Sequence, residues 1–139
     1  MKLVVDASVA IKWFLAARPE EVHLAQAEAV AAAIEDSRTE LFAPSHWIAE
    51  IIGVLARVEP GIIDDALLVL DDMKPTLIDG VSTVRRAADI SIRLNHHLFD
   101  TLYHAVAIET SAILVTADDA YFDKAKTLGA IQQLREFAV

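Results

Sequence analysis

The sequence predicts a three-layer α/β/α sandwich with a mainly parallel central sheet, formed by residues 1–139 as a single domain. Three observations lead to this prediction. Short runs of aliphatic and β-branched residues alternate along the chain with longer helical segments. The first run, residues 2–6, is apolar from Leu3 to Val5 and rich in β-branched residues, as expected of a buried parallel strand. Only four Gly and four Pro interrupt the chain, with no linker or repeat.

Apolar runs and prolines define the first elements. Residues 2–6 are expected to form the first strand, followed by a short helix over 8–16. Pro19 stands directly before two glutamates, which is a favourable helix start, so an alanine-rich helix is expected over 20–36. A short strand then follows at 41–43 and ends at a proline.

The middle of the chain contains two more helices and another strand. Ser45 is suited to cap a helix over 46–58. A proline–glycine pair then interrupts the chain. The next helix is expected over 62–73, and a short strand follows at 75–78.

The last third of the chain completes the alternation. Ser82 can cap a helix over 83–95, whose small and apolar residues fall on one side. Asp100, or a residue near it, would cap the next helix, which extends to about Thr110. The remaining elements are a strand, a helix that stops at a glycine, and a final strand, expected at 112–116, 120–128 (before Gly129) and 130–134.

Composition limits the classes of function. The 21 acidic residues outnumber the 12 basic ones, giving a net charge of −9. This charge argues against non-specific nucleic-acid binding, unless the acids gather in a metal site or a local basic rim contacts the phosphates. The absence of cysteine excludes disulfides and thiolate metal sites and fits a cytoplasmic location. No apolar stretch is long enough to cross a bilayer, and the early Asp6 argues against a signal peptide.

Four carboxylates stand within or at the ends of apolar segments. Asp6 ends one predicted strand, and Asp118 closely follows another. Glu50 is the only charge in residues 47–56, and Asp100 opens a helical segment. Charges beside core-forming segments are costly unless they are paired or bound to a cation. Because ligands bind at the carboxyl edge of an open α/β sheet, Asp6 and Asp118 are expected to face one site.

A shared divalent cation would account for such a cluster. Two carboxylates roughly 4 Å apart repel by about 4 kcal/mol at an effective dielectric near 20, so that without a cation one would take up a proton. Mg²⁺ and Mn²⁺ prefer oxygen ligands, and Mg²⁺ keeps waters that can serve as nucleophiles. Such sites suit phosphodiester hydrolysis.

Four segments, taken in order, resemble the PIN domain family and, within it, the VapC-type toxin ribonucleases of toxin–antitoxin pairs. They are LVVDAS at 3–8, AEII at 49–52, FDTLYHAVA at 99–107 and LVTADDAYFDKAKTLG at 114–129. The resemblance covers nearly the whole chain. It implies an α/β fold, an RNA substrate, Mg²⁺ or Mn²⁺ as cofactor, a cognate antitoxin, a homodimer and no membrane association.

The resemblance also implies roles for individual residues. The catalytic acidic cluster would comprise Asp6, Glu50, Asp100 and Asp118. The metal ion would be held by Asp6, Asp100 and Asp118. The hydroxyl groups of Ser8 and Thr116 match positions near the metal-bound water and in the last motif. The supporting residues would therefore be Ser8, Thr116 and the neighbouring acid Asp119.

Two positions depart from the pattern of this family. Gly53 stands where many such toxins have Asn, and Thr101 replaces the common Ala. Gly53 and the net charge of −9 favour an alternative, a PIN-like binding module without catalysis. A third class is a phosphoryl-accepting signalling domain or an aspartate-nucleophile phosphatase. The phosphatase would need a second Asp two residues after Asp6, where this chain has Ser8, and the signalling domain would need an acidic pair beside the first strand and a Lys after a late strand.

Each acid also has a structural explanation that needs no metal. Asp6 and Asp100 could cap the helices that follow them. Glu50 could reach solvent from the edge of its helix. Asp118 is favoured over the adjacent Asp119 as a ligand, and Asp119 could cap the last helix or lie at the rim.

Histidines, bases and large apolar residues complete the candidates. The pair His96-His97 is expected on a loop surface, and His104 is expected to pack or hydrogen bond within the fold. No HExxH-like spacing indicates zinc. Bases that could contact an RNA backbone are Lys12, which could lie near the site, Arg57, Arg85, Arg86 and Arg93. Large apolar residues expected in the core, with part left for a dimer or antitoxin surface, are Trp13, Phe14, Trp47, Ile51, Ile52 and Leu55.

Overall fold

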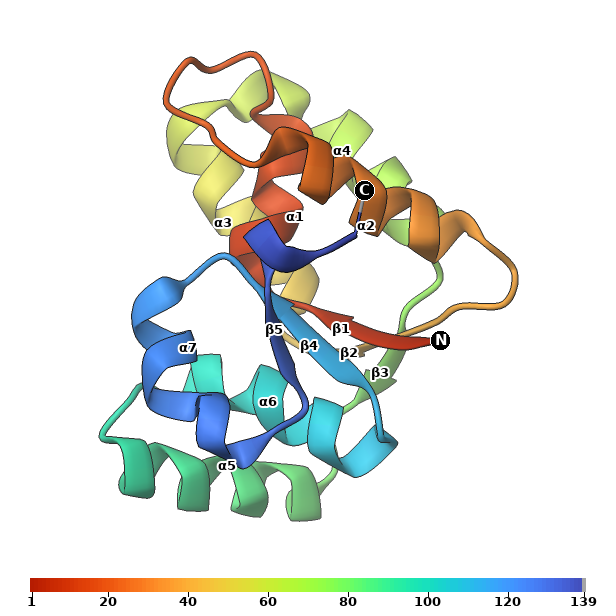
Figure 1. Cartoon of the computed structure of the whole chain (residues 1–139). Coiled ribbons are helices and arrows are strands. Elements are labelled where there is room, and N and C mark those ends of the chain that lie inside the picture. The colour runs from red at the N-terminus through yellow and green to blue at the C-terminus, as the bar shows by residue number, and fades with distance from the viewer. Residues whose placement is uncertain (139) are drawn as a thin grey trace.

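The computed structural model describes residues 1–138, which form an α/β/α sandwich around one parallel sheet (Figure 1). The fold class predicted from the sequence is therefore confirmed. The strands are β1 (Lys2–Val5), β2 (Glu40–Pro44), β3 (Thr76–Ile78), β4 (Ile113–Thr116) and β5 (Ile131–Gln133). They are hydrogen-bonded in the order β3-β2-β1-β4-β5, and each lies within two residues of its predicted range.

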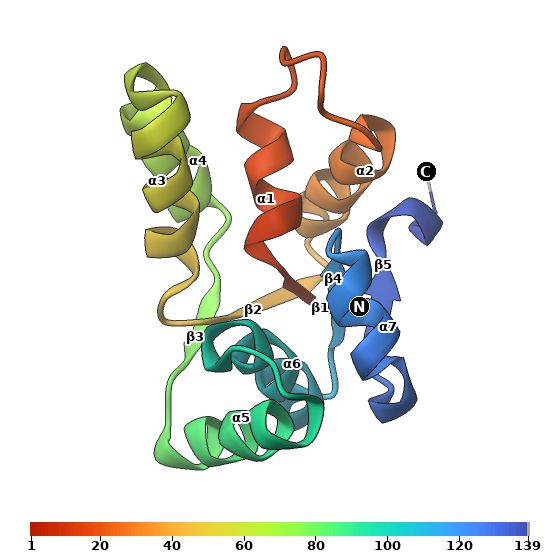
Figure 2. The same ribbon diagram turned by 90° about the vertical axis from the view of Figure 1, so that its left-hand side faces the viewer.

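Helices cover both faces of this sheet (Figure 2). The first face carries α1 (Ala7–Phe14), α2 (Leu24–Glu35), α3 (Trp47–Val58) and α4 (Ile63–Asp72). The opposite face carries α5 (Val81–Leu94), α6 (Leu98–Thr110) and α7 (Asp119–Ala125). Short 3-10 turns occur at Pro60–Ile62, Lys126–Leu128 and Leu134–Glu136. None of the helices in residues 1–138 is long and apolar enough to cross a membrane.

The core is built on the two central strands. Every side chain of β1 after Lys2 is buried, and so is every side chain of β4 after Ile113. Strands covered on both faces need apolar residues at every position, which explains why these segments read as continuous apolar runs. The apolar cluster predicted from the sequence belongs mainly to this core. Its fully buried members are Trp47, Ile51 and Leu55, and its partly buried members are Trp13, Phe14 and Ile52.

The order of the strands creates a switch point between β1 and β4. The chain winds from β1 through β2 to β3, and then returns to the other side of β1 with β4. The connections that leave β1 and β4 run in opposite directions, which opens a crevice at the carboxyl ends of these strands. Asp6 directly follows β1, and Asp118 lies two residues beyond β4. The fold therefore brings two distant acids to one edge.

The start of α2 differs from the prediction. This helix begins at Leu24 rather than at position 20, and the preceding segment forms turns. Glu21 lies in an ion pair with Lys12 of α1, with 3.0 Å between Nζ and Oε2. This contact holds the segment against α1. It also engages Lys12, one of the bases considered for RNA binding.

Two predicted capping residues do not cap. The N-cap of α3 is His46, so that Ser45 lies outside the helix. The N-cap of α5 is Gly80, so that Ser82 lies in the first turn. In both cases the helix begins within one or two residues of the predicted position, because the apolar pattern rather than the cap sets where it packs.

Candidate metal centre

Asp6 lies in the turn between β1 and α1. It occupies the N-cap position of α1, but its carboxylate makes no capping hydrogen bond. Its Oδ2 instead accepts hydrogen bonds from Ser8 Oγ at 2.9 Å and from Thr116 Oγ1 at 2.8 Å. The capping explanation for Asp6 is therefore wrong. The side chain is held by hydroxyl groups that follow β1 and end β4.

The two hydroxyl groups are themselves oriented by backbone amides. The Ala117 N–H donates to Ser8 Oγ at 3.1 Å, and the Asp118 N–H donates to Thr116 Oγ1 at 3.0 Å. A hydroxyl that accepts from an amide keeps its own hydrogen free to donate. Both hydrogens therefore point at Asp6, and the carboxylate is fixed in one orientation.

Glu50 lies in the first turn of α3, across the crevice. Tyr103 donates its hydroxyl hydrogen to Glu50 Oε2 at 2.9 Å. His46 Nε2 lies 3.2 Å from the same oxygen and 3.1 Å from the carbonyl oxygen of Phe99. Because a carbonyl can only accept, His46 Nε2 carries a hydrogen shared between the two oxygens. Glu50 is thus fixed by two partners, while its side chain stays 34% exposed at the crevice.

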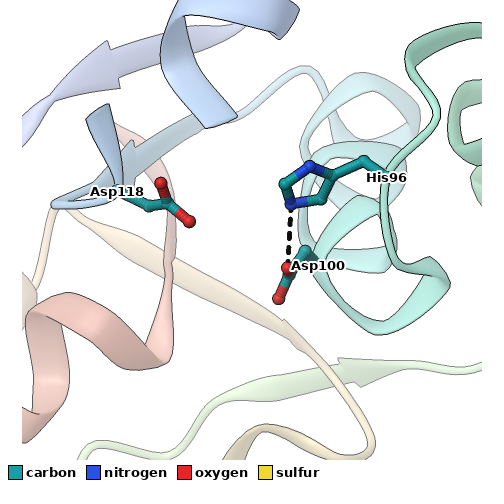
Figure 3. A group of neighbouring side chains, drawn as sticks. All are labelled: His96, Asp100 and Asp118. Carbon is teal, nitrogen blue, oxygen red and sulfur yellow. Dashed lines mark hydrogen bonds and ion pairs between the residues drawn. The ribbon is translucent and has the colours of Figure 1, made fainter. Parts of the chain in front are cut away.

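Asp100 and His96 meet at the start of α6. The N-cap of this helix is His97, so Asp100 lies in its first turn and the capping explanation for Asp100 is wrong. Its Oδ2 lies 2.9 Å from His96 Nε2 (Figure 3). Figure 3 also shows Asp118 facing this pair from the loop after β4. One ligand atom from each of His96, Asp100 and Asp118 lies within 4.8 Å of the others.

The adjacent acids Asp118 and Asp119 point in different directions. Asp118, not Asp119, caps α7, because its Oδ1 accepts from the Tyr121 N–H at 3.0 Å. Its other oxygen remains available to the centre. Asp119 is exposed; its Oδ1 accepts from Gln133 Nε2 at 3.0 Å and its Oδ2 lies 3.7 Å from Arg135.

The predicted acids influence two buried tyrosines. Burial, followed by the charge of Glu50, then of Asp6 and less strongly of Asp100, raises the pKa of Tyr103. Burial, followed by the charges of Asp100, Asp6 and Asp118, raises the pKa of Tyr121. Charges act at these rings only if they lie nearby. Among the described residues, the ligand atoms that lie within 4.8 Å of one another are those of His96, Asp100 and Asp118, with Asp6 and Glu50 on neighbouring elements.

The surroundings of Asp6 disfavour its ionisation. Burial raises the pKa of Asp6 from 3.8 to about 6, against the hydrogen bonds from Thr116 and Ser8, and the charges of Glu50 and Asp100 add to the rise. A divalent cation would reverse this balance by favouring the ionised carboxylate. A set of carboxylate oxygens suits a hard ion such as Mg²⁺ or Mn²⁺. The residues present therefore fit the cofactor that the sequence implied.

Sequence reasoning missed two residues beside the centre. His96 was expected on a loop surface, and this prediction is wrong, because its side chain is only 14% exposed and contacts Asp100. Lys124 of α7 was not considered, and its Nζ lies 3.1 Å from His96 Nδ1. One signal was available: His96 precedes Asp100 by four residues, as His46 precedes Glu50.

His104 behaves as the sequence predicted. It is fully buried, and burial lowers its pKa against the hydrogen bond to the Gly129 carbonyl. Its Nε2 donates to Gly129 O at 2.8 Å, so its Nδ1 accepts from the Tyr121 hydroxyl at 2.9 Å. The ring ties α6 to the C-terminal part of the fold and takes no place among the acids.

The departures from the expected motif have different consequences. Thr101 is fully buried, and its hydroxyl lies 2.8 Å from the Ala87 carbonyl oxygen, which links α6 to α5. Gly53 lies on the exposed side of α3, where an added Cβ would meet no atom within 4 Å.

Among the bases considered for contact with an RNA backbone, Arg85 is already paired, because its Nη2 lies 3.1 Å from Asp89 Oδ1.

A profile of the PIN domain family matches residues 3–128, and the chain therefore belongs to the PIN domain family. Among solved structures, it is similar to VapBC-1 from nontypeable Haemophilus influenzae, with a TM-score of 0.65 and 15% sequence identity. The match covers 98% of this chain and 100% of the other. At this identity the likeness concerns the fold. No curated protein sequence matches the chain significantly.

Proposed function

We propose that the chain is a metal-dependent endoribonuclease and the toxin of a toxin–antitoxin pair. The observation that carries this proposal is the gathering of acids at the switch point between β1 and β4: Asp6 accepts a hydrogen bond there from Thr116, and ligand atoms of Asp100 and Asp118 lie within 4.8 Å of each other. Membership of the PIN domain family supports a nuclease. The fold shared with VapBC-1 supports a toxin of this type.

The proposed roles follow from how each carboxylate is held. Asp6, Asp100 and Asp118 would hold the ion, with Asp6 fixed by its two hydroxyl donors. Glu50, held by Tyr103, would orient water at the opposite side of the centre. When bound, Mg²⁺ or Mn²⁺ would supply an activated water and neutralise the phosphate.

An open groove offers a path for the RNA substrate. Its volume is about 790 Å³, and Asn95, His96 and Lys124 are among the residues that line it. It adjoins the centre through His96. The chain has a net charge of −9, so RNA would depend on the bound cation and on local bases such as Lys124 for attraction.

The proposed partners are a cognate antitoxin and a second copy of the chain. Of the apolar residues named from the sequence, Trp13, Phe14 and Ile52 are only partly buried. Leu67, Leu68 and Val69 of α4, exposed by 41%, 71% and 43%, add further apolar surface for a partner. A toxin of this kind would act on RNA in the cytoplasm.

An RNA cleavage assay tests the proposed activity. The purified chain, free of antitoxin, is expected to cleave RNA with Mg²⁺ or Mn²⁺ and not with EDTA. Asp6→Asn is expected to lose this cleavage, because the amide cannot replace a carboxylate ligand. Asp89→Asn is the matched control, since Asp89 is an exposed acid of α5 paired with Arg85. Unchanged metal-dependent cleavage by the Asp6→Asn variant would contradict the assignment.

A non-catalytic PIN-like binding module is the second candidate, and Gly53 is the observation that favours it. Calorimetric titration of the wild-type chain with Mn²⁺ separates the two. An absence of binding at millimolar Mn²⁺ supports the binding module, whereas binding that requires Asp6 supports the enzyme.

A further inference from the structure

We propose that His96 is a positioning residue of the metal centre: Lys124 fixes its tautomer, and its Nε2–H orients the Asp100 carboxylate. This inference rests on the proposed metal-dependent function. It assigns a role to a histidine and a lysine that lie outside the four acids.

The backbone of His96 is fixed between α5 and α6. Asn95 ends α5 in the left-handed conformation, with φ of 50°, and this turns the chain back toward the helix. The His96 N–H then donates to the Ser91 carbonyl oxygen at 3.1 Å. The Ser91 hydroxyl donates to the His96 carbonyl oxygen. His96 therefore enters the centre from a rigid turn.

The imidazole ring is held on its other sides as well. It packs edge-on against Tyr121, with 4.8 Å between the ring centroids. Lys124 Nζ lies 3.1 Å from His96 Nδ1 and 3.3 Å from the carbonyl oxygen of Asn95. The ring thus has a contact at each nitrogen and another on the Tyr121 ring, which leaves it one orientation.

These contacts determine where the ring proton lies. A lysine ammonium can only donate, so His96 Nδ1 must accept. In a neutral ring the proton then sits on Nε2, and Nε2 donates to Asp100 Oδ2 at 2.9 Å. Lys124 therefore donates to His96 Nδ1, and His96 Nε2 donates to the carboxylate of Asp100.

The same geometry disfavours His96 as a direct metal ligand. A ring nitrogen of His96 is close enough to share an ion with the two acids, since it lies within 4.8 Å of carboxylate oxygens of Asp100 and Asp118. Binding through Nε2 would move the ring proton to Nδ1, where it would face the Lys124 ammonium at 3.1 Å. Two donors would then oppose each other. A histidine that orients a ligand from outside typically contributes 10- to 100-fold to metal affinity.

Calorimetry with Mn²⁺ alone tests the inference. We expect His96→Ala to weaken binding about tenfold or more, and His96→Gln to restore it to within about threefold, because the glutamine amide can still donate to Asp100. Asp89→Asn, which changes the exposed acid of α5 paired with Arg85, is the control and should leave affinity unchanged. Denaturant unfolding curves identify any variant that loses its fold.

The outcomes separate this inference from the proposed function. A wild-type chain that does not bind Mn²⁺ contradicts the metal centre itself. Wild-type binding that His96→Ala leaves unchanged overturns the role of His96 alone, as does a Gln variant as weak as the folded Ala variant. Pulsed EPR of bound Mn²⁺ should show no directly coordinated nitrogen, and long-range ¹H–¹⁵N NMR should place the proton on Nε2. A coordinated nitrogen, or a proton on Nδ1, would overturn the positioning role.

Discussion

At the scale of single residues, Asp6 combines two properties that oppose each other in the metal-free protein. Its carboxylate is oriented by two hydroxyl donors, yet its pKa is raised from 3.8 to about 6. An acid whose pKa is higher in the folded state binds more protons there than in the unfolded chain. Stability in EDTA therefore falls as the pH rises through the window from about 4 to about 6.

The first prediction follows from the raised pKa of Asp6. Asp6→Asn removes the cost of the ionised carboxylate and should stabilise the metal-free protein at pH 7 by up to about 3 kcal/mol, since one pKa unit corresponds to about 1.4 kcal/mol. The gain over the wild type should shrink as the pH falls toward 4. Urea unfolding in EDTA across this range measures both. A variant no more stable than the wild type at pH 7 would contradict the raised pKa.

The second prediction concerns the hydroxyl that holds Glu50. Because the pKa of Tyr103 is raised, its hydroxyl stays protonated and donates to Glu50 at any physiological pH. Tyr103→Phe should cost about 1 kcal/mol of unfolding free energy and weaken Mn²⁺ binding several-fold, while His46 keeps its contact. Urea unfolding and calorimetry check the two effects. Unchanged Mn²⁺ affinity would show that the orientation of Glu50 does not matter for the ion.

At the scale of elements, Asp118 serves both α7 and the centre. Its Oδ1 caps the helix, and a carboxylate oxygen of the same side chain lies within 4.8 Å of ligand atoms of Asp100 and His96. These roles can be separated by substitution, because serine also caps helices but offers no carboxylate.

The third prediction uses this difference. Asp118→Ala should lose about 1 kcal/mol of stability together with Mn²⁺ affinity, whereas Asp118→Ser should lose affinity and keep most of the stability. Asp119→Ala, in which the contacts to Gln133 and Arg135 are removed, should change Mn²⁺ affinity far less. Thermal unfolding and calorimetry measure the set. A larger loss of affinity in Asp119→Ala than in Asp118→Ala would reverse the assignment of the two acids.

The elements also show what the sequence could predict. Buried parallel strands must be apolar at every position, so β1 and β4 were recognisable from composition alone. The start of α2 was not, because Glu21, expected within the helix, lies before it and pairs instead with the distant Lys12 of α1. The place of His96 depends on the left-handed turn at Asn95 and on Lys124, which lies 28 residues further along the chain. No local pattern in the sequence encodes the contact between His96 and Lys124.

At the scale of the whole molecule, the centre draws on both halves of the chain. Asp6 comes from the strand at which the winding reverses, Glu50 from the first helical layer, and Asp100 from the second. Their sequence positions are far apart, so only the folded chain brings these oxygens together. An ion held by Asp6, Asp100 and Asp118 should therefore bind the native state and not the unfolded chain.

The fourth prediction is therefore a coupling between metal and stability. A ligand that binds only the native state adds about 2.7 kcal/mol at one hundred times its Kd. Mn²⁺ should raise the Tm of the wild type progressively with concentration, and it should leave the Tm of Asp6→Asn and Asp100→Asn nearly unchanged. The first of these variants should be the more stable protein in EDTA and the less stable one in saturating Mn²⁺. The Tm values of the wild type and of Asp6→Asn, plotted against Mn²⁺ concentration, should therefore cross. If the acids did not form a cation site, the Asp6→Asn variant would keep the higher Tm at every Mn²⁺ concentration.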